Sequence, residues 1–243
     1  MASSLSASPV QIRCKGILFD MDGILISSLG SVERSWTKWA AMRGIDPAAA
    51  LAIVHGCRSI DSVRRLRPDL DAEAENRIVE GMEMEDTDGV HVLSGVPELL
   101  RALPAARWTV VTSATEGLAR VRMAAAGIPV PERFISAEQV AKGKPHPDPY
   151  LAGAALLGFD PADCVVFEDA ASGSKAGSAA GCVVVATTFS HSVESLDAAD
   201  YLIEDVTGVG VEVLPGNEGL VLKLMPLGAW GESRKCGKTS LRG

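Results

Sequence analysis

Residues 15–23 read KGILFDMDG, a short apolar run that ends in two carboxylates, Asp20 and Asp22, separated by one residue. A run of this length that is bounded by a charged residue and a glycine is typical of a buried strand. Similar runs return at 108–112 (WTVVT), 164–169 (CVVFED) and 182–186 (CVVVA). The sequence therefore predicts four buried strands.

Alanine-rich stretches with helical spacing separate these strands, and several of them are followed by a glycine, which suits a helix C-terminus. They cover residues 95–103, 116–126, 149–157 and 172–180. Strands and helices that alternate in this way build a parallel sheet with helices on its faces. We expect the α/β class and a Rossmann-like, doubly wound parallel sheet.

The alternation is interrupted between about residues 28 and 94, where no strand-like run occurs and four segments have helical spacing. These segments are residues 30–42, 47–56, 59–66 and 71–85. We predict a helical domain inserted after the first strand. The predicted domains are a core of residues 13–27 and 92–228, an inserted helical domain of residues 28–91, and flexible tails at residues 1–12 and 229–243. Near the end of the core, a glycine-containing turn between residues 211–214 and 220–224 predicts a β-hairpin.

The composition excludes several classes of protein. With 47% hydrophobic and 22% charged residues among 243, the chain can bury a sizeable core, so global disorder is excluded. The 23 lysines and arginines are outnumbered by 31 aspartates and glutamates, which gives a net charge of −8. We therefore expect no nucleic-acid partner, because no basic excess is available to neutralise phosphates. The expected assembly is a monomer or a weak homodimer.

The expected compartment is the cytoplasm. The first residues lack the apolar core of a signal peptide, and no stretch approaches the ~18 apolar residues of a membrane span. We therefore expect no membrane association. The five cysteines form an odd set without CxxC spacing, which indicates reduced thiols rather than a disulfide framework.

Chemistry-bearing residues cluster where the predicted strands end. In open parallel sheets, ligands bind at the carboxyl ends of the strands. The residues that follow the strands, together with one lysine placed before a helix, are Asp20, Asp22, Thr112, Ser113, Ala114, Glu168, Asp169 and Lys144. Carboxylates suit Mg²⁺, which is usually held by one or two of them together with a substrate phosphate. The pattern predicts a site for a hard cation and an anion, and hence phosphoryl chemistry.

Two other structures could explain these residues. An EF-hand calcium loop starting at Asp20 would need Asp or Asn at the position of Ile24 and Gly at the position of Leu25, so it is excluded. Each carboxylate taken alone could simply cap a turn. The ends of three strands and the lysine before a helix all carry such residues, in order along the chain, and this favours a functional site.

The order of these motifs resembles that of the haloacid dehalogenase superfamily of phosphohydrolases, over about residues 13–205. The motifs are DMDG at 20–23, the strand ending in Thr112-Ser113, GKPHPDPY at 143–150, and the apolar run ending in Glu168-Asp169. The segments VERSWTKWA (32–40) and HGCRSIDSV (55–63) resemble the cap of the branch that contains sugar and polyol phosphatases. The resemblance implies a core with an inserted cap domain and a phosphoric monoester hydrolase that depends on Mg²⁺.

The resemblance also assigns roles to residues. It makes Asp20 the nucleophile that becomes an aspartyl phosphate, and Asp22 the acid that protonates the leaving alcohol and then the base that activates water. Lys144, preferred over Lys142 because it aligns with the Lys-Pro pair of the third motif, would offset charge on the transferring group, and Ser113 would hold its oxygens. The implied metal ligands are Asp20, the backbone carbonyl of Asp22, and Asp169, with Glu168 in or just outside the ligand shell.

Substrate contacts are expected from two places. Thr112 and Ala114 flank Ser113 in the loop that would receive the phosphate, and His55, Gly56 and Arg58 belong to the cap pattern HGxRxxD. Two further residues of the insert, Trp36 and Trp39, are spaced for the core of the cap rather than for a sugar-stacking platform. The chain departs from the family at Ser27, where an aspartate is usual in the hinge, and at Ile24.

The predicted function is a Mg²⁺-dependent phosphatase that hydrolyses phosphate monoesters of small sugars or polyols. The expected partner is a small phosphorylated metabolite. Two alternatives stay open at this point. A phosphomutase of the β-phosphoglucomutase type shares all four motifs, although the cap pattern disfavours it. A non-catalytic phosphate-binding protein is disfavoured because every reacting group is present.

Overall fold

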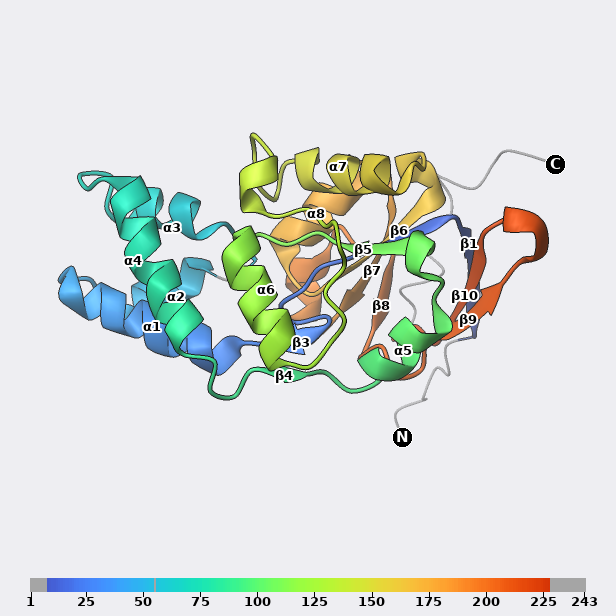
Figure 1. The fold of residues 1–243 in the computed structure, drawn as a ribbon, viewed down its shortest axis with the longest axis horizontal. Helices are drawn as coiled ribbons and strands as arrows, with labels where there is room; N and C mark the ends of the chain where they lie inside the picture. Colours follow the sequence, from blue (N-terminus) through green and yellow to red (C-terminus); the bar gives the residue numbers. More distant parts are fainter. Residues whose placement is uncertain (1–7, 55, 228–243) are drawn as a thin grey trace.

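The computed structural model describes residues 8–54 and 56–227. It has two domains, a sheet domain and a helical domain inserted into it (Figure 1). The helical domain lies at the left of Figure 1, and a second, small sheet lies at the right-hand end. The main sheet therefore separates the inserted helices from the small sheet.

The main sheet is parallel and has five strands in the order β5-β2-β6-β7-β8. Its strands are β2 (Gly16–Phe19), β5 (Trp108–Val110), β6 (Cys164–Glu168), β7 (Val183–Thr187) and β8 (Tyr201–Ile203). The four predicted strands and the α/β class are confirmed. The edge strand β8 was not predicted, because a three-residue apolar segment flanked by acidic residues gives too short a pattern.

The two faces of this sheet are covered by different helices, because side chains alternate along each strand. On β2, Leu18 packs into a cluster with Tyr150 of α7, whereas Ile17 and Phe19 pack into the cluster that contains Leu118 of α6. The helices of the core are α5 (Val96–Ala102), α6 (Glu116–Ala125), α7 (Asp148–Leu157) and α8 (Ala171–Ala179). Short 3₁₀ turns link several elements, at η1 (Ala105–Arg107), η2 (Ala137–Gln139), η3 (Pro161–Asp163), η4 (Val193–Leu196) and η5 (Pro215–Asn217).

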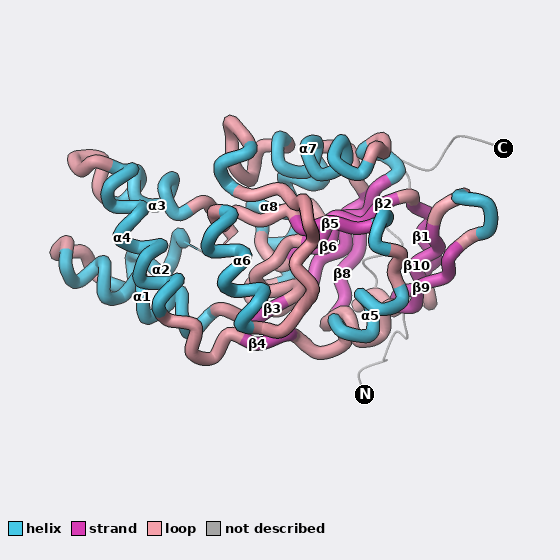
Figure 2. Tube along the Cα trace, in the orientation of Figure 1, coloured by secondary structure: helices cyan, strands magenta, loops and turns pink. Residues whose placement is uncertain are grey.

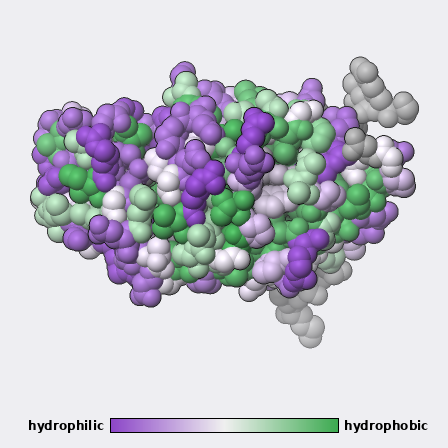
Figure 3. All heavy atoms as spheres, viewed as in Figure 1, coloured by the Kyte–Doolittle hydropathy of each residue, from purple (hydrophilic) through white to green (hydrophobic). Residues whose placement is uncertain are grey.

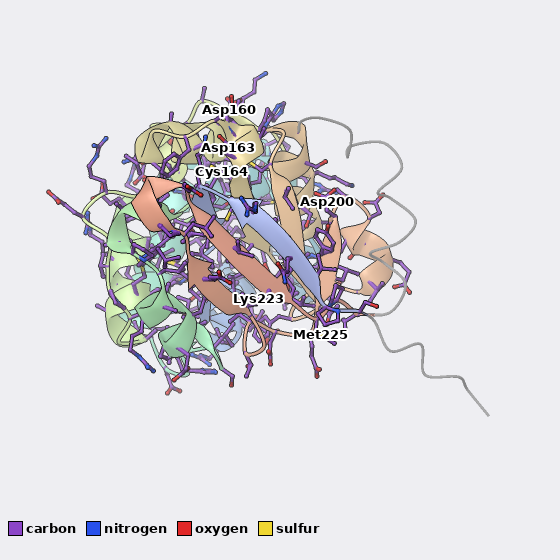
Figure 4. The ribbon with its side chains drawn as sticks, turned by 90° about the vertical axis from the view of Figure 1, so that its right-hand side faces the viewer. Asp160, Asp163, Cys164, Asp200, Lys223 and Met225 are labelled. Carbon is purple, nitrogen blue, oxygen red and sulfur yellow. The ribbon has the colours of Figure 1, made fainter. Side chains whose placement is uncertain are left out.

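The small sheet is antiparallel and has the order β1-β10-β9. Its strands are β1 (Val10–Cys14), β9 (Gly210–Val213) and β10 (Leu220–Leu224). Figure 4 looks onto it and shows Lys223 on β10, which pairs with Glu212 of β9 at 2.9 Å. The predicted hairpin is confirmed by the pairing of β9 with β10.

The predicted N-terminal tail is wrong at residues 10–12, which belong to β1. Each of them pairs with a residue of β10, and Ile12 is buried against the core. A strand that pairs with a segment more than 200 residues away leaves no local signal in the sequence. The predicted tails at residues 1–7 and 229–243 lie outside the described residues.

The inserted domain consists of four helices, α1 (Leu29–Met42), α2 (Pro47–Val54), α3 (Ser59–Leu66) and α4 (Ala72–Glu85). It has its own hydrophobic cluster, in which Trp36 and Trp39 pack edge to face with ring centroids 5.3 Å apart. The Trp39 indole N–H donates a hydrogen bond to Glu75 Oε2 at 2.8 Å. The expectation that both tryptophans lie in the core of this domain agrees with their burial.

Two short strands join the domains, β3 (Ile26–Ser27) before the insert and β4 (His91–Val92) after it. They pair with each other in antiparallel register, with Ile26 opposite Val92 and Ser27 opposite His91. Figure 2 shows this pair (magenta) at the junction, apart from the other strands. Ser27, the position that departs from the family pattern, therefore belongs to the hinge between the domains.

The surface, the helices and the cysteines bear on the expectations from the sequence. On the face shown in Figure 3, hydrophilic and hydrophobic residues are interspersed over both domains. Among residues 8–54 and 56–227, no helix combines the length and the apolar character needed to cross a membrane. The described cysteines, Cys14, Cys57, Cys164 and Cys182, are all free thiols.

Candidate active site

A buried lysine ties together the ends of three neighbouring strands. Lys144 Nζ donates to Asp20 Oδ1 after β2 at 2.5 Å, to Glu168 Oε1 of β6 at 2.7 Å, and to the Val111 carbonyl after β5 at 3.1 Å. Its side chain is only 1% exposed. Lys142, the competing lysine, is exposed to solvent. The structure therefore places Lys144, and not Lys142, on the expected nucleophile.

Glu168 is held by hydrogen bonds on both carboxylate oxygens. Oε1 accepts from Lys144 and from the Tyr150 hydroxyl at 2.6 Å, and Oε2 accepts from the backbone N–H groups of Asp169 at 3.0 Å and Ala170 at 3.1 Å. These four bonds use the four lone pairs of the carboxylate. Tyr150 was not predicted as a site residue, although its place at the end of the GKPHPDPY motif was a signal that could have identified it.

Three buried carboxylates meet beside this lysine. Asp20, Glu168 and Asp169 each offer an oxygen atom, and these atoms lie within 4.8 Å of one another. Burial raises the pKa of Asp20 to about 7, against the opposing effect of Lys144, and burial together with the charge of Glu168 raises the pKa of Asp169 well above its usual value. One lysine does not balance three carboxylates, so the cluster fits a hard divalent cation, which would favour the ionised forms.

The turn that follows Asp20 is shaped to pass this cluster. Gly23 has φ +86°, and a Cβ atom there would lie 1.9 Å from Asp169 Oδ2. Glycine is therefore required both by the left-handed backbone and by the close approach of the carboxylate. This explains why the DMDG motif ends in glycine.

The Asp22 side chain is hydrogen-bonded to residues outside the carboxylate cluster. Its Oδ1 accepts a hydrogen bond from the Ser28 hydroxyl at 2.5 Å, and its Oδ2 accepts one from Arg122 Nη1 at 3.1 Å. Arg122 lies on α6 and also approaches Glu83 Oε1 of α4, with Nη2 at 3.3 Å. Burial raises the pKa of Glu83 to about 7, and the neighbouring Arg122 opposes this rise.

Arg122 and Glu83 were not identified from the sequence. Each is one of several charged residues on an amphipathic helix, where a charged side chain is normally solvated. Their burial shows that they are not surface residues, because Arg122 is 4% exposed and Glu83 is 3% exposed. Only the contact between α4 and α6 brings them together, since 39 residues separate them along the chain.

The loop after β5 also contributes side chains to the site. Thr112 Oγ1 accepts a hydrogen bond from the backbone N–H of Ala114 at 3.1 Å, which fixes the loop, and Ser113 Oγ lies 3.4 Å from the Gly56 carbonyl. The same carbonyl accepts a bond from the Ser172 hydroxyl at 3.0 Å. The backbone of Gly56 thus brings the inserted domain onto the core at the site.

The remaining residues expected from the cap do not all reach the site. His55 lies outside the described residues. Arg58 donates through Nε to Asp61 at 2.7 Å, and its Nη1 lies 3.4 Å from the Val140 carbonyl and 3.5 Å from that of Ala141. Among the described residues, those that line the cavity at Asp20 do not include Arg58. The arginine holds the inserted domain against the loop that leads to Lys144.

A cavity between the two domains contains the site. Part of this cavity is open to solvent. Asp20, Asp169, Thr112 and Ser113 line one part of it, and the rest includes Asp22, Arg122 and Glu83 together with the apolar side chains of Leu29, Val32, Trp36, Val54 and Leu118. Asp20, Asp22 and Asp169 thus face one cavity, and Lys144 is bonded to Asp20.

Comparison with known proteins identifies the class. Residues 14–181 match the family of haloacid dehalogenase-like hydrolases, and the chain belongs to this family. It is 40% identical over 215 residues to hexitol phosphatase A of Escherichia coli, which covers 86% of this chain and all of that protein. It is 35% identical over 222 residues to glycerol-1-phosphate phosphohydrolase 1 of Saccharomyces cerevisiae, which covers 85% of this chain and 88% of that protein.

Solved structures support the fold. β-Phosphoglucomutase from Clostridium difficile has a TM-score of 0.70 at 20% identity, over 80% of this chain and 92% of that chain. At this level of identity, the likeness extends to the fold alone. The resemblance drawn from the sequence motifs and the expected fold are both confirmed.

Proposed function

We propose that this enzyme is a Mg²⁺-dependent phosphatase that hydrolyses phosphate monoesters of small sugars or polyols through an aspartyl-phosphate intermediate. The observation that carries the proposal is the contact of Lys144 with Asp20, which lines an interdomain cavity together with Asp169. The geometry supports attack by a carboxylate on a phosphoryl group whose charge is offset on several sides.

Asp20 and Asp169 are the side chains that would hold the magnesium ion directly. Glu168 lies close enough to contribute, but its four hydrogen bonds already use its lone pairs. We therefore assign Glu168 the role of orienting Lys144. When bound, the cation offsets negative charge on the transferring phosphoryl group.

The covalent step divides one displacement into two. An Asp20 oxygen forms a bond to phosphorus while the bond from phosphorus to the alcohol oxygen breaks, and Asp22 gives the alcohol its proton. Asp22 then takes a proton from the water that attacks phosphorus, which releases phosphate and restores Asp20. Ser113 and the backbone N–H groups of its loop hold the phosphoryl oxygens.

The substrate class rests on two observations. The two relatives described above are a hexitol phosphatase and a glycerol-1-phosphate phosphohydrolase. Hexitols and glycerol are both polyols. The inserted domain covers the catalytic end of the sheet through Gly56 and α4, so the cavity admits a small metabolite and obstructs a folded phosphoprotein.

The experiment that tests this proposal is a screen of phosphate release from a panel of sugar, polyol and nucleotide monophosphates. We expect polyol and sugar phosphates to rank highest in kcat/KM. EDTA should abolish release, Mg²⁺ should restore it, and Asp20→Asn should be inactive because an amide cannot form the acyl phosphate. Release that persists with EDTA, or in Asp20→Asn, would refute the mechanism. Conversion of a hexose 1-phosphate into the 6-phosphate without free phosphate would instead establish a phosphomutase.

A further inference from the structure

Two buried charged side chains line the cavity but have no part in the phosphoryl steps. Glu83 comes from α4 of the inserted domain and Arg122 from α6 of the core, and both are more than nine-tenths buried. Charged groups are rarely buried unless they are paired or serve a ligand. The position of this pair in the same cavity as Asp20 indicates a ligand.

Arg122 has more donors than the described residues use. A guanidinium carries five N–H groups. Nη1 bonds to Asp22, and Nη2 is 3.3 Å from Glu83, yet within the part of the chain that the structure describes no acceptor forms a well-oriented hydrogen bond with Nε or Nη2. Buried donors of this kind are costly unless a partner reaches them. Arg122 lines the cavity, so an acceptor that enters the cavity comes next to this guanidinium.

The location of the pair relative to Asp22 defines which part of a substrate it would meet. Asp22 is the group that would give a proton to the ester oxygen, and Arg122 is hydrogen-bonded to that same carboxylate. A substrate atom that contacts both Arg122 and Glu83 therefore lies on the alcohol side of the ester, close to the ester carbon. The apolar side chains of Trp36 and Leu118 line the same cavity and offer contact to carbon.

A hydroxyl group has the chemistry that this pair requires. It can accept a hydrogen bond from the guanidinium and donate one to the Glu83 carboxylate at the same time, and such bonds to charged groups are stronger than neutral ones. An alkyl chain at this position would offer no acceptor to Arg122 and no donor to Glu83. A second phosphate would be repelled by Glu83.

We propose that Arg122 and Glu83 are specificity-determining residues that together bind the hydroxyl on the carbon next to the ester carbon of a polyol phosphate. This inference deepens the proposed function and rests on it for the position of the phosphate. Because one residue belongs to each domain, the hydroxyl site is complete only when the inserted domain lies against the core. Polyol phosphates are thereby separated from simple alkyl phosphates.

The test is a binding measurement that does not depend on turnover. Calorimetric titration of the full-length Asp20→Asn protein with Mg²⁺ compares glycerol 1-phosphate with 3-hydroxypropyl phosphate, which lacks only the hydroxyl in question. We expect glycerol 1-phosphate to bind at least about tenfold more tightly, since a hydrogen bond to a charged group is worth that factor or more. Glu83→Leu in the same background should reduce this ratio to below about threefold.

Two further variants complete the design. Glu83→Leu leaves Arg122 without a carboxylate from α4, so the double variant Glu83→Leu/Arg122→Met removes both charges together, which is better tolerated in a buried pair. It should lose the preference as well. Glu85→Leu is the matched control, because Glu85 is an exposed residue at the end of α4 and does not line this cavity. It should retain the preference.

The outcomes separate the inference from the proposed function. A ratio near one in the Asp20→Asn protein, a ratio that survives in the Glu83 and double variants, or an equal loss in Glu85→Leu would overturn the inference. Failure of the wild-type protein to release phosphate from either ester would instead refute the proposed function, and the binding ratio would still decide whether this pair recognises the hydroxyl.

Discussion

Replacement of the buried lysine offers a quantitative test of the electrostatics of the site. Lys144→Met retains the length of the side chain but removes the ammonium group that contacts Asp20, Glu168 and the Val111 carbonyl. Breaking a buried ion pair by removing one partner costs about 3–5 kcal/mol. With a denaturant dependence of about 2–3 kcal/mol per M urea for a chain of this size, the unfolding midpoint should fall by about 1–2.5 M.

The loss should depend on pH in a definite direction. The pKa of Asp20 is already raised to about 7 by burial, and removal of the lysine raises it further because Lys144 favours the ionised form. A carboxyl whose pKa is raised in the folded state binds its proton more tightly there than in the unfolded chain. The folded state therefore regains stability as the pH falls from about 7 towards 4, which is about the pKa of an aspartate in the unfolded chain. The deficit of Lys144→Met should therefore be larger at about pH 8 than at about pH 5.

The assay is urea unfolding with EDTA present, at both pH values, together with kcat measured in Mg²⁺. We expect kcat to fall by about 10²–10³-fold, the usual effect of removing one electrostatic contact to the transition state. Lys142→Met is the matched control, because Lys142 is exposed two residues earlier and should change stability by less than about 0.5 kcal/mol. An equal deficit at both pH values, or a midpoint equal to that of the control, would refute the account of three carboxylates compensated by one lysine.

Three further predictions concern the acid, the turn and the cap. Asp22→Asn should lower kcat/KM by about 10²–10⁴-fold for polyol phosphates and by less for p-nitrophenyl phosphate, whose leaving group needs no proton; equal losses would contradict the acid role. Gly23→Ala should raise the Mg²⁺ concentration for half-maximal activity by about 10–100-fold, because its Cβ would displace the Asp169 carboxylate. Gly127→Ala, at a positive φ with open space around it, is the control and should leave the Mg²⁺ requirement unchanged. Arg58→Ala should lower kcat/KM equally for polyol phosphates and p-nitrophenyl phosphate, by about tenfold, because two backbone contacts that hold the inserted domain are lost; a loss confined to polyol phosphates would show that Arg58 binds substrate.

The sequence predicts the parts of the fold that have strong local patterns. The buried strands that end at Asp20 and Glu168 are uniform apolar runs, and the helices of the insert have clear helical spacing, so both could be predicted. β1 and β8 could not, because their assignment depends on partners distant in the chain. For the same reason, nothing in the sequence indicated that the two linkers of the insert pair as β3 and β4.

The candidate site divides in the same way. The residues that follow strands, such as Asp20 and Asp169, could be predicted because the carboxyl ends of parallel strands share one edge of the sheet. Arg58 was expected near substrate from its pattern, but the structure places it against a core loop. Arg122 and Glu83 were missed, because the sequence does not show which element packs against a charged residue of a helix.

The pairing of β3 with β4 places the two ends of the inserted domain side by side. Ser27 and His91 lie opposite each other in the antiparallel register, so their backbones are only about 5 Å apart. A two-residue Asn-Gly turn can span this gap in place of residues 28–90 without stretching the core. Because the two ends of the insert lie side by side, a different insert could be joined at these two residues without a change in the path of the core strands.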